Sequence, residues 1–373
     1  MPLPRSLIEG TTGFKQLSND KLVFLGNHES GTSWILKYER KPTPPGGGFP
    51  DKELPTRQAQ WRRSFAVIAE LYSRVCPGQP AIAGDPASTA IPGFPEHKLL
   101  SEAQGLLLKE LDSLRWDSAL KPALNVYDDD QDPRRKTFLG FFIAMECVQD
   151  LYDFDWAKAK ATLSATEFAA WQQARLATLT ERKFRTLGKI AAVDILVGNR
   201  DRFLNLTSAA PINNAGNIFF SGKNQFAGDA VALDFFDPSS QWLDLYSPLS
   251  VAKTAEAQPY YSIDILGLTR ASADFQHFGI NVVKQIGDAL GVNLFNGNFV
   301  AEFIDGFEDG IKALQVEILN WQSWNDKKWT VGGKKVTPYP PRQLWIRAKH
   351  LGWPLPKYDK ANVPAVFNEL FKK

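Results

Sequence analysis

The chain has 373 residues, of which 44% are hydrophobic and 23% are charged, a profile typical of a folded protein with a sizeable core in one large domain or two lobes. Its 43 basic and 41 acidic residues leave a net charge of +2, so the composition gives no reason to expect a nucleic-acid partner. The two cysteines are too few for a disulfide framework, and the four dispersed histidines argue against a zinc site rich in His and Cys.

The opening residues, MPLPRSLIEG, lack the apolar segment of a secretory signal. No run in the chain approaches the roughly eighteen apolar residues that a membrane-spanning helix needs, so we expect no membrane span. Because the chain has so few cysteines, we expect it to work in a reducing, cytoplasmic compartment.

The amino-terminal part has the pattern of strands followed by a helix. KLVFLG (21–26) and SWILKYE (33–39) are rich in β-branched and aromatic residues and flank the turn NHESG, which predicts a hairpin. The Pro- and Gly-rich segment 41–55 predicts a loop. Residues 56–76 predict a helix, because apolar residues recur there at helical spacing. These apolar residues are Trp61, Phe65, Ile68 and Tyr72.

The rest of the chain opens with a continuous apolar run, TFLGFFIAMECV (137–148), which is short enough to be a buried strand. Beyond it the pattern becomes mostly helical, with a small pair of strands inside the helical part. The predicted helices are 165–183, 184–197, 270–290, 298–320 and 361–372, and the predicted strands are NIFF (217–220) and AVALDFF (230–236).

This segregation of strands and helices predicts an α+β fold with two lobes. We expect a β-rich N-lobe over residues 1–148, containing the hairpin, a helix and the buried strand. We expect a mainly α-helical C-lobe over residues 149–373. The seam between them is predicted directly after Val148.

Three polar residues flank apolar segments in the C-terminal half. Asp201 lies in the run NRDR, just after an apolar helix that ends at Gly198, a favourable helix cap. Asn217 opens the strand NIFF, and Asp234 ends the strand VAL, so we expect all three side chains to converge on one pocket. Carboxylate and amide oxygens suit Mg²⁺, and a separate Asp can take the proton of an acceptor hydroxyl. The set therefore indicates phosphoryl transfer.

The motifs DILVGNRDRF, GNIFF and ALD resemble the protein-kinase-like superfamily, in the branch whose catalytic loop has D-R in place of H-R-D. That branch includes the phosphoinositide kinases, the HipA-type kinases and the actin-fragmin kinase catalytic domain, to which the motifs are most similar. The resemblance is local, covering roughly residues 184–238. It implies a bilobal kinase-like fold that binds ATP and Mg²⁺, with Asp201 as the catalytic residue and Asn217 and Asp234 as the metal ligands.

The same resemblance implies nucleotide-binding residues in the N-terminal half. Lys37, on the predicted strand SWILKYE, is the expected partner of the ATP phosphates. The turn GNHESG, from Gly26 to Gly31, is the candidate phosphate-covering turn, because backbone N–H groups in such a turn can meet anions. AMECV matches a hinge, in which the backbones of Glu146 and Val148 hold adenine.

Two ligand assignments stay open. Fifteen residues lie between Asp201 and Asn217, where the usual protein-kinase loop has about four, so residues 204–215 must bulge outward. If they do not, Asn205 is the rival metal ligand. The sequence DFF stands in place of DFG, so Asp237 is a second candidate for the role of Asp234.

The acidic partner of Lys37 is also open. Glu70 is the acidic residue of the predicted helix 56–76, but it lies away from the apolar stripe, and Gln58 or Gln60 is the alternative. As activity, we expect phosphate transfer to a hydroxyl, most simply to Ser or Thr of a protein. The alternatives are a small-molecule or lipid kinase, a nucleotidyl transferase, or a nucleotide-binding pseudokinase that acts as an interaction module.

Overall fold

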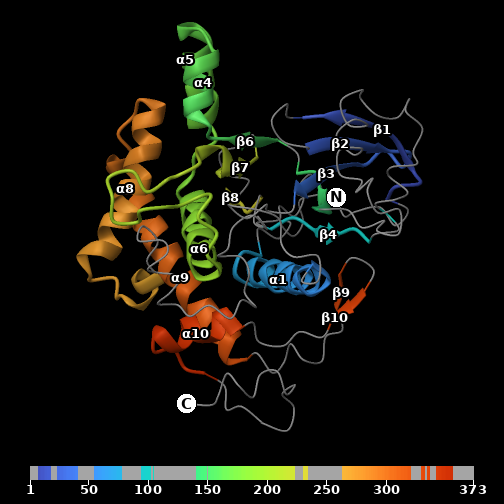
Figure 1. Cartoon of the computed structure of the whole chain (residues 1–373). Helices are drawn as coiled ribbons and strands as arrows, with labels where there is room; N and C mark the ends of the chain where they lie inside the picture. The colour runs from blue at the N-terminus through green and yellow to red at the C-terminus, as the bar shows by residue number, and fades with distance from the viewer. Residues whose placement is uncertain are drawn as a thin grey trace, which may run out of the picture.

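The computed structural model of the chain describes residues 7–17, 23–40, 54–77, 94–101, 104, 140–148, 150–222, 230–233, 263–320, 329–331, 334–336 and 342–355. Within these segments the protein is a mixed α and β structure. A five-stranded sheet lies on one side, helices and a small sheet lie on the other, and helix α1 runs between them (Figure 1). The predicted α+β class is therefore confirmed.

The larger sheet is antiparallel throughout, with the strand order β1-β2-β3-β5-β4. Its strands are β1 (Thr11–Gln16), β2 (Val23–His28), β3 (Ser33–Arg40), β4 (His97–Leu99) and β5 (Gly140–Glu146). The predicted hairpin is the β2–β3 pair, and the predicted buried strand is β5. The sequence pattern did not predict β4, which has only three residues.

The two faces of the sheet carry different residues, because successive side chains of a strand point to opposite sides. On β3, Trp34, Leu36 and Tyr38 belong to a cluster that lies wholly within the amino-terminal part. Ile35 alternates with them and packs against the main core instead, as do Ile143 and Met145 of β5. The latter face is therefore the one that meets α1 and the helical part.

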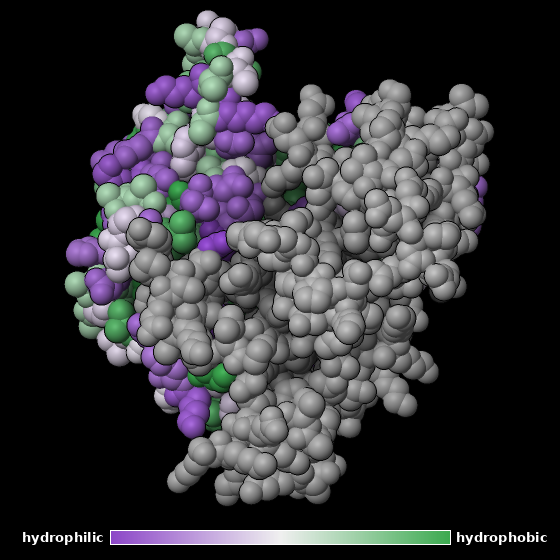
Figure 2. Space-filling model, viewed as in Figure 1, coloured by the Kyte–Doolittle hydropathy of each residue, from purple (hydrophilic) through white to green (hydrophobic). Residues whose placement is uncertain are grey.

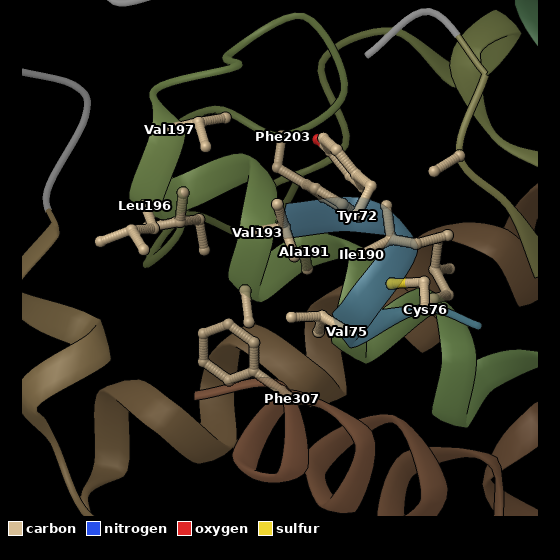
Figure 3. Packing of buried hydrophobic residues seen from close by; sticks show 14 of the residues in the cluster. Tyr72, Val75, Cys76, Ile190, Ala191, Val193, Leu196, Val197, Phe203 and Phe307 are labelled. Carbon is tan, nitrogen blue, oxygen red and sulfur yellow. The ribbon is translucent and has the colours of Figure 1, made fainter. Parts of the chain in front are cut away.

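Helix α1 (Leu54–Val75) joins β3 to β4 and confirms the helix predicted over 56–76. Phe65, Ile68 and Tyr72 are buried, as their spacing predicted, whereas the side chain of Trp61 lies outside the described residues. Helix α1 packs on α6 and α9 to a similar extent, and it also contacts β9 and β4. Figure 3 shows Tyr72 and Val75 of α1, and Cys76 directly after it, in one cluster with α6 residues and Phe307.

The helical part follows β5 after a connection that contains the predicted seam. Its helices are α4 (Trp156–Thr162), α5 (Ala165–Leu176), α6 (Glu181–Val197), α8 (Ala273–Leu290), α9 (Phe299–Leu319) and α10 (Arg342–His350). Short 3-10 segments are η3 (Ala215–Asn217), η5 (Ile263–Gly267) and η6 (Leu294–Asn296). The strands β6 (Leu151–Asp153), β7 (Phe219–Ser221) and β8 (Ala230–Val231) form a small antiparallel sheet, and β9 (Trp329–Val331) pairs with β10 (Lys334–Val336).

Most predicted helices of this part are present, with one boundary wrong. The expected break at 183/184 lies instead between Leu176 and Glu181, because the N–H groups of Thr178 and Leu179 donate to carbonyl oxygens three residues earlier, which ends the i to i−4 bonding of α5. The strand expected over 217–220 begins two residues later, at Phe219, because Asn217 belongs to η3. The helix predicted over 361–372 lies outside the described residues.

Helices α6 and α9 form the most intimate helix pair of the structure, and glycines allow their close approach. A Cβ atom on Gly306 would lie 1.8 Å from the Arg185 carbonyl oxygen, and one on Gly188 would lie 2.2 Å from the Phe303 carbonyl oxygen. Both distances join a side-chain position to backbone, which cannot rotate away. The crossing therefore requires glycine at both positions.

The face seen in Figure 2 is mostly hydrophilic over the helical part, with small scattered apolar areas. Few large apolar side chains are exposed among the described residues, Val316 and Leu17 being the most exposed at 52% and 51%. No helix in the described part of the chain has the length and apolar character to cross a bilayer.

Candidate functional site

The loop that contains Asp201 is set by the end of α6. Gly198 has φ +86° and caps the helix, and its N–H and that of Asn199 both donate to the Asp194 carbonyl, at 2.8 Å each. From the other side, Arg347 of α10 is 1% exposed and donates from Nη1 to the Leu196 carbonyl oxygen at 2.5 Å. The last turn of α6 is therefore held firmly before the polar run begins.

The structure brings Asp201 and Asn217 together. Asn217 Nδ2 donates to Asp201 Oδ2 at 2.6 Å, although the two residues are 16 positions apart in the chain. The backbone N–H of Asp201 donates to Asn199 Oδ1 at 3.2 Å, which orients the loop locally. Asp201 is half-buried and Asn217 is buried. The predicted return of Asn217 to the side of Asp201 is confirmed.

The long insertion between these residues is accommodated as a closed loop on α8. Phe203 and Ile212 form an isolated antiparallel β-bridge, and the Leu204 N–H donates to the Pro211 carbonyl at 2.9 Å. These contacts bring the two ends of the insertion together. Gln285 of α8 accepts a hydrogen bond from the Ile212 N–H at 2.9 Å. Asn205, the rival ligand, lies beyond this closure in an exposed turn with φ +51°.

Arg202 joins three segments at the base of the site. Its guanidinium is 1% exposed, and Nη1 donates to Asp194 Oδ2 of α6 at 2.5 Å. Nε donates to the Asn217 carbonyl oxygen at 2.7 Å, and Nη2 donates to the Leu233 carbonyl oxygen at 2.5 Å. The fork of fixed N–H groups thereby sets the relative positions of the Asp201 loop, η3 and Leu233, which follows β8.

Asp194 is the buried anion that holds this guanidinium. Its Oδ1 accepts hydrogen bonds from the Tyr72 hydroxyl of α1 and from Asn199 Nδ2, the latter at 2.9 Å. Burial raises the pKa of Asp194, and the charge of Arg202 and these hydrogen bonds oppose the rise. Because Arg202, Tyr72 and Asn199 all donate to the carboxylate, its charged form is the one that the site satisfies.

Tyr72 belongs to the same network. Burial raises the pKa of its hydroxyl well above the usual value, and the neighbouring Asp194 carboxylate raises it further. The phenol therefore stays protonated and acts as a donor, which connects α1 to the base of the site.

Lys37 lies in the middle of the larger sheet, paired with Val23 on β2 and with Ile143 on β5. It is 8% exposed, and by alternation it shares the face of Ile35, which meets α1 and the helical part. A buried strand position on that face is consistent with a lysine that points toward the centre of the molecule.

The structure does not bring the turn GNHESG to Lys37. The turn connects β2 and β3 at their Ser33 end, whereas Lys37 pairs with Val23 toward the other end of both strands. The two glycines have local explanations. A Cβ atom on Gly26 would lie 2.7 Å from Trp34 Nε1, and Gly31 has φ +81° in the turn.

The predicted hinge residues follow the pairing of β5 with β4. The Glu146 N–H donates to the Glu96 carbonyl at 2.8 Å, and Glu146 Oε2 accepts from the Glu96 N–H at 3.2 Å. Val148 is half-buried just after the strand, and burial raises the pKa of the intervening Cys147 thiol. The N–H of Glu146 is therefore bonded within the protein.

Several predicted site residues lie outside the described residues. Asp234 and Asp237 are among them, whereas Leu233, which precedes Asp234, is described and accepts a hydrogen bond from Arg202 through its carbonyl oxygen. The side chains of Gln58 and Gln60 do as well. Glu70 is described, and it accepts a hydrogen bond from Arg74 Nε at 2.7 Å.

The described residues contain no group of three or more His, Cys, Asp or Glu side chains that would hold a metal ion. A cavity of about 350 Å³ lies between the end of α1, α6 and α9, where Cys76, Arg182 and Lys189 are among its lining residues. It includes none of the predicted site residues. The site is thus defined by hydrogen-bonded side chains and not by that cavity.

Sequence reasoning missed the supporting residues Tyr72, Asp194 and Arg202. One signal was available for Asp194, because an acid inside the apolar helix segment IAAVDILV is costly unless it is paired. The pairing partners themselves had no such signal.

No family model matches this chain, and no curated protein or solved structure is significantly similar to it.

Proposed function

We propose that this chain is an ATP- and magnesium-dependent phosphotransferase in which Asp201 acts on the acceptor hydroxyl and Asn217 and Asp234 hold the metal. The observation that carries the proposal is the hydrogen bond of 2.6 Å between Asp201 and Asn217, closed across the insertion. Packing alone does not require the insertion to bring an amide back to a carboxylate. We therefore assign this hydrogen-bonded pair a role in function.

The chemistry of Asn217 fits a metal ligand. Its Nδ2 faces the Asp201 carboxylate, which accepts hydrogen bonds and cannot donate when ionised, so the amide orientation follows from the partner. The Oδ1 atom therefore points away from Asp201 and is the kind of oxygen that Mg²⁺ prefers. When bound, the metal ion would neutralise charge on the nucleotide phosphates.

Asp201 fits the role of the group that orients the acceptor and takes its proton. Oδ2 is held by Asn217, and within the described residues Oδ1 accepts no hydrogen bond. That oxygen is the atom available to an acceptor hydroxyl. The Asn199 side chain and the Arg202 anchor on either side keep the loop from rotating the carboxylate away.

The amino-terminal part supports a nucleotide role. An antiparallel sheet with α1 packed on its inner face, and a single strand β5 that leads to the helical part, agrees with the N-lobe that the kinase resemblance implies. In this proposal Lys37 meets the phosphates and the backbone at Glu146 and Val148 meets adenine. The acceptor is proposed to be Ser or Thr of a protein, on the resemblance alone.

The proposal is tested by measuring the affinity for magnesium–ATP by calorimetry and the transfer of radiolabelled γ-phosphate to water, to the chain itself and to a mixture of proteins. Asp201→Asn should leave ATP affinity within a few-fold and reduce turnover by about 10²–10⁴-fold, the range for a general acid–base group. If binding falls as far as turnover, Asp201 is a metal ligand or a structural residue instead.

The alternatives differ in the outcome of the same assays. Binding of the nucleotide without transfer to any acceptor would indicate a pseudokinase, for which the DFF sequence is the motivating feature. Transfer to small molecules or lipids but not to protein would indicate another kinase of this fold. Absence of magnesium-dependent binding by the wild-type chain would refute the proposal.

A further inference from the structure

The hydrogen bonds beneath the site form a continuous path from α1 to the proposed catalytic residues. The Tyr72 hydroxyl of α1 donates to Asp194 Oδ1, and the other carboxylate oxygen, Oδ2, accepts from Arg202 Nη1 at 2.5 Å. Arg202 in turn binds the Asn217 carbonyl oxygen, and Asn217 binds Asp201. Each member is buried except Asp201, which is half-buried.

The contribution of Tyr72 is specific to its hydroxyl group. Its ring packs in the core between α1 and α6, which a phenylalanine would do equally well (Figure 3). The hydroxyl, however, donates a hydrogen bond to the Asp194 carboxylate, as Asn199 Nδ2 does, and that carboxylate forms an ion pair with Arg202. A carboxylate free to rotate would no longer hold both Nη1 and the loop in one position.

Arg202 links the position of Asp194 to the positions of the site residues. Three of its N–H groups bind three segments, so a shift of the guanidinium moves the backbones of Asn217 and Leu233 relative to Asp201. Displacements of about 1 Å in a catalytic group can reduce a rate by about 10²-fold. The site is therefore sensitive to a hydroxyl group that does not touch it.

We infer that Tyr72 is a positioning residue for the proposed phosphoryl transfer, acting through Asp194 and Arg202 on Asp201 and Asn217. The inference rests on the proposed function for its effect on catalysis, and on geometry alone for its effect on the loop. By this inference, the site forms correctly only when helix α1, which lies between β3 and β4 in the chain, is correctly packed.

The test compares Tyr72→Phe with Ile68→Val, which removes one buried methyl group from the same helix and leaves the hydrogen bonds intact. Backbone exchange is followed at Leu204, Asn213 and Asn217, whose N–H groups donate to Pro211, Arg202 and Asn214. We expect Tyr72→Phe to accelerate exchange there by about tenfold or more, as the loss of a hydrogen bond to a charged group predicts, and Ile68→Val to leave it unchanged.

Turnover provides the second readout. Tyr72→Phe should reduce kcat by about tenfold relative to Ile68→Val, the scale of an outer-shell partner. If exchange at the three N–H groups is the same in both variants, the inference is wrong. If exchange rises but no variant, nor the wild type, transfers phosphate, the positioning role stands and the proposed function fails.

Discussion

The crossing of α6 and α9 leads to a graded prediction for three glycines. A Cβ atom would lie 1.8 Å from the Arg185 carbonyl oxygen at Gly306, 2.2 Å from the Phe303 carbonyl oxygen at Gly188, and 2.8 Å from the Ala192 Cβ at Gly310. An ordinary contact begins at 3.4 Å, so Gly306→Ala requires the helices to separate locally by about 1.6 Å. Gly310→Ala requires less than half of that.

The magnitudes follow from two opposing effects. Alanine favours a helix over glycine by about 1 kcal/mol, which stabilises every variant of the series. Overpacking costs about 1–3 kcal/mol, or more where the obstacle is backbone. We therefore expect Gly306→Ala to lower the free energy of unfolding by about 2 kcal/mol or more, Gly188→Ala by less, and Gly310→Ala to remain within about 1 kcal/mol of wild type.

Urea denaturation at 25 °C measures the series, provided that the slope with denaturant is the same for all variants. Because α6 also positions the loop that contains Asp201, Gly306→Ala should reduce phosphate transfer by more than the fraction of unfolded protein explains. If the order of the unfolding free energies is inverted, with Gly310→Ala the most destabilised, the contact between Gly306 and the Arg185 carbonyl oxygen does not limit the approach of the helices.

Two further outcomes concern the nucleotide site. Asn217→Ala should weaken magnesium-dependent ATP binding in calorimetry whereas Asn205→Ala should not, because Asn205 lies in the exposed turn of the insertion; the reverse result would make Asn205 the ligand. Burial raises the pKa of Cys147, so its alkylation should be slow at neutral pH, accelerate only above the pH at which an ordinary thiol ionises, and be slowed by magnesium–ATP. Cys76, which is 1% exposed, should stay unreactive while the protein is folded, and lack of protection of Cys147 would argue against the hinge assignment.

The fold was predictable where a local pattern marks one element. The helical spacing of α1, the β-branched and aromatic segments that flank the hairpin turn, and the continuous apolar run of β5 are such patterns, and the structure contains each element. Strands β4 and β6 have three residues each and take their identity from pairing with distant strands, so no local pattern marks them. Strand β8 falls within the predicted strand 230–236 but covers only Ala230–Val231. The strand order depends on the same long-range pairing.

The site divides along similar lines. Asp201 and Asn217 could be predicted as neighbours because each borders a strongly apolar segment, and the turn-forming residues between them allow closure. The pairing of Arg202 with Asp194 could not, since its charge stands beside Asp201 in sequence and suggests that Asp201 is its partner. Similarly, the glycines of GNHESG suggested a phosphate-binding turn, but the register places that turn away from Lys37.

The hydrogen bond from Arg347 to the Leu196 carbonyl oxygen also has a consequence for biosynthesis. The donor is translated 151 residues after the acceptor. At about 5–20 residues per second, the ribosome therefore synthesises Arg347 roughly 8–30 s after Leu196. Until then the carbonyl must bind water or remain mobile. A nascent chain therefore acquires the finished Asp201 loop only after α10 has emerged.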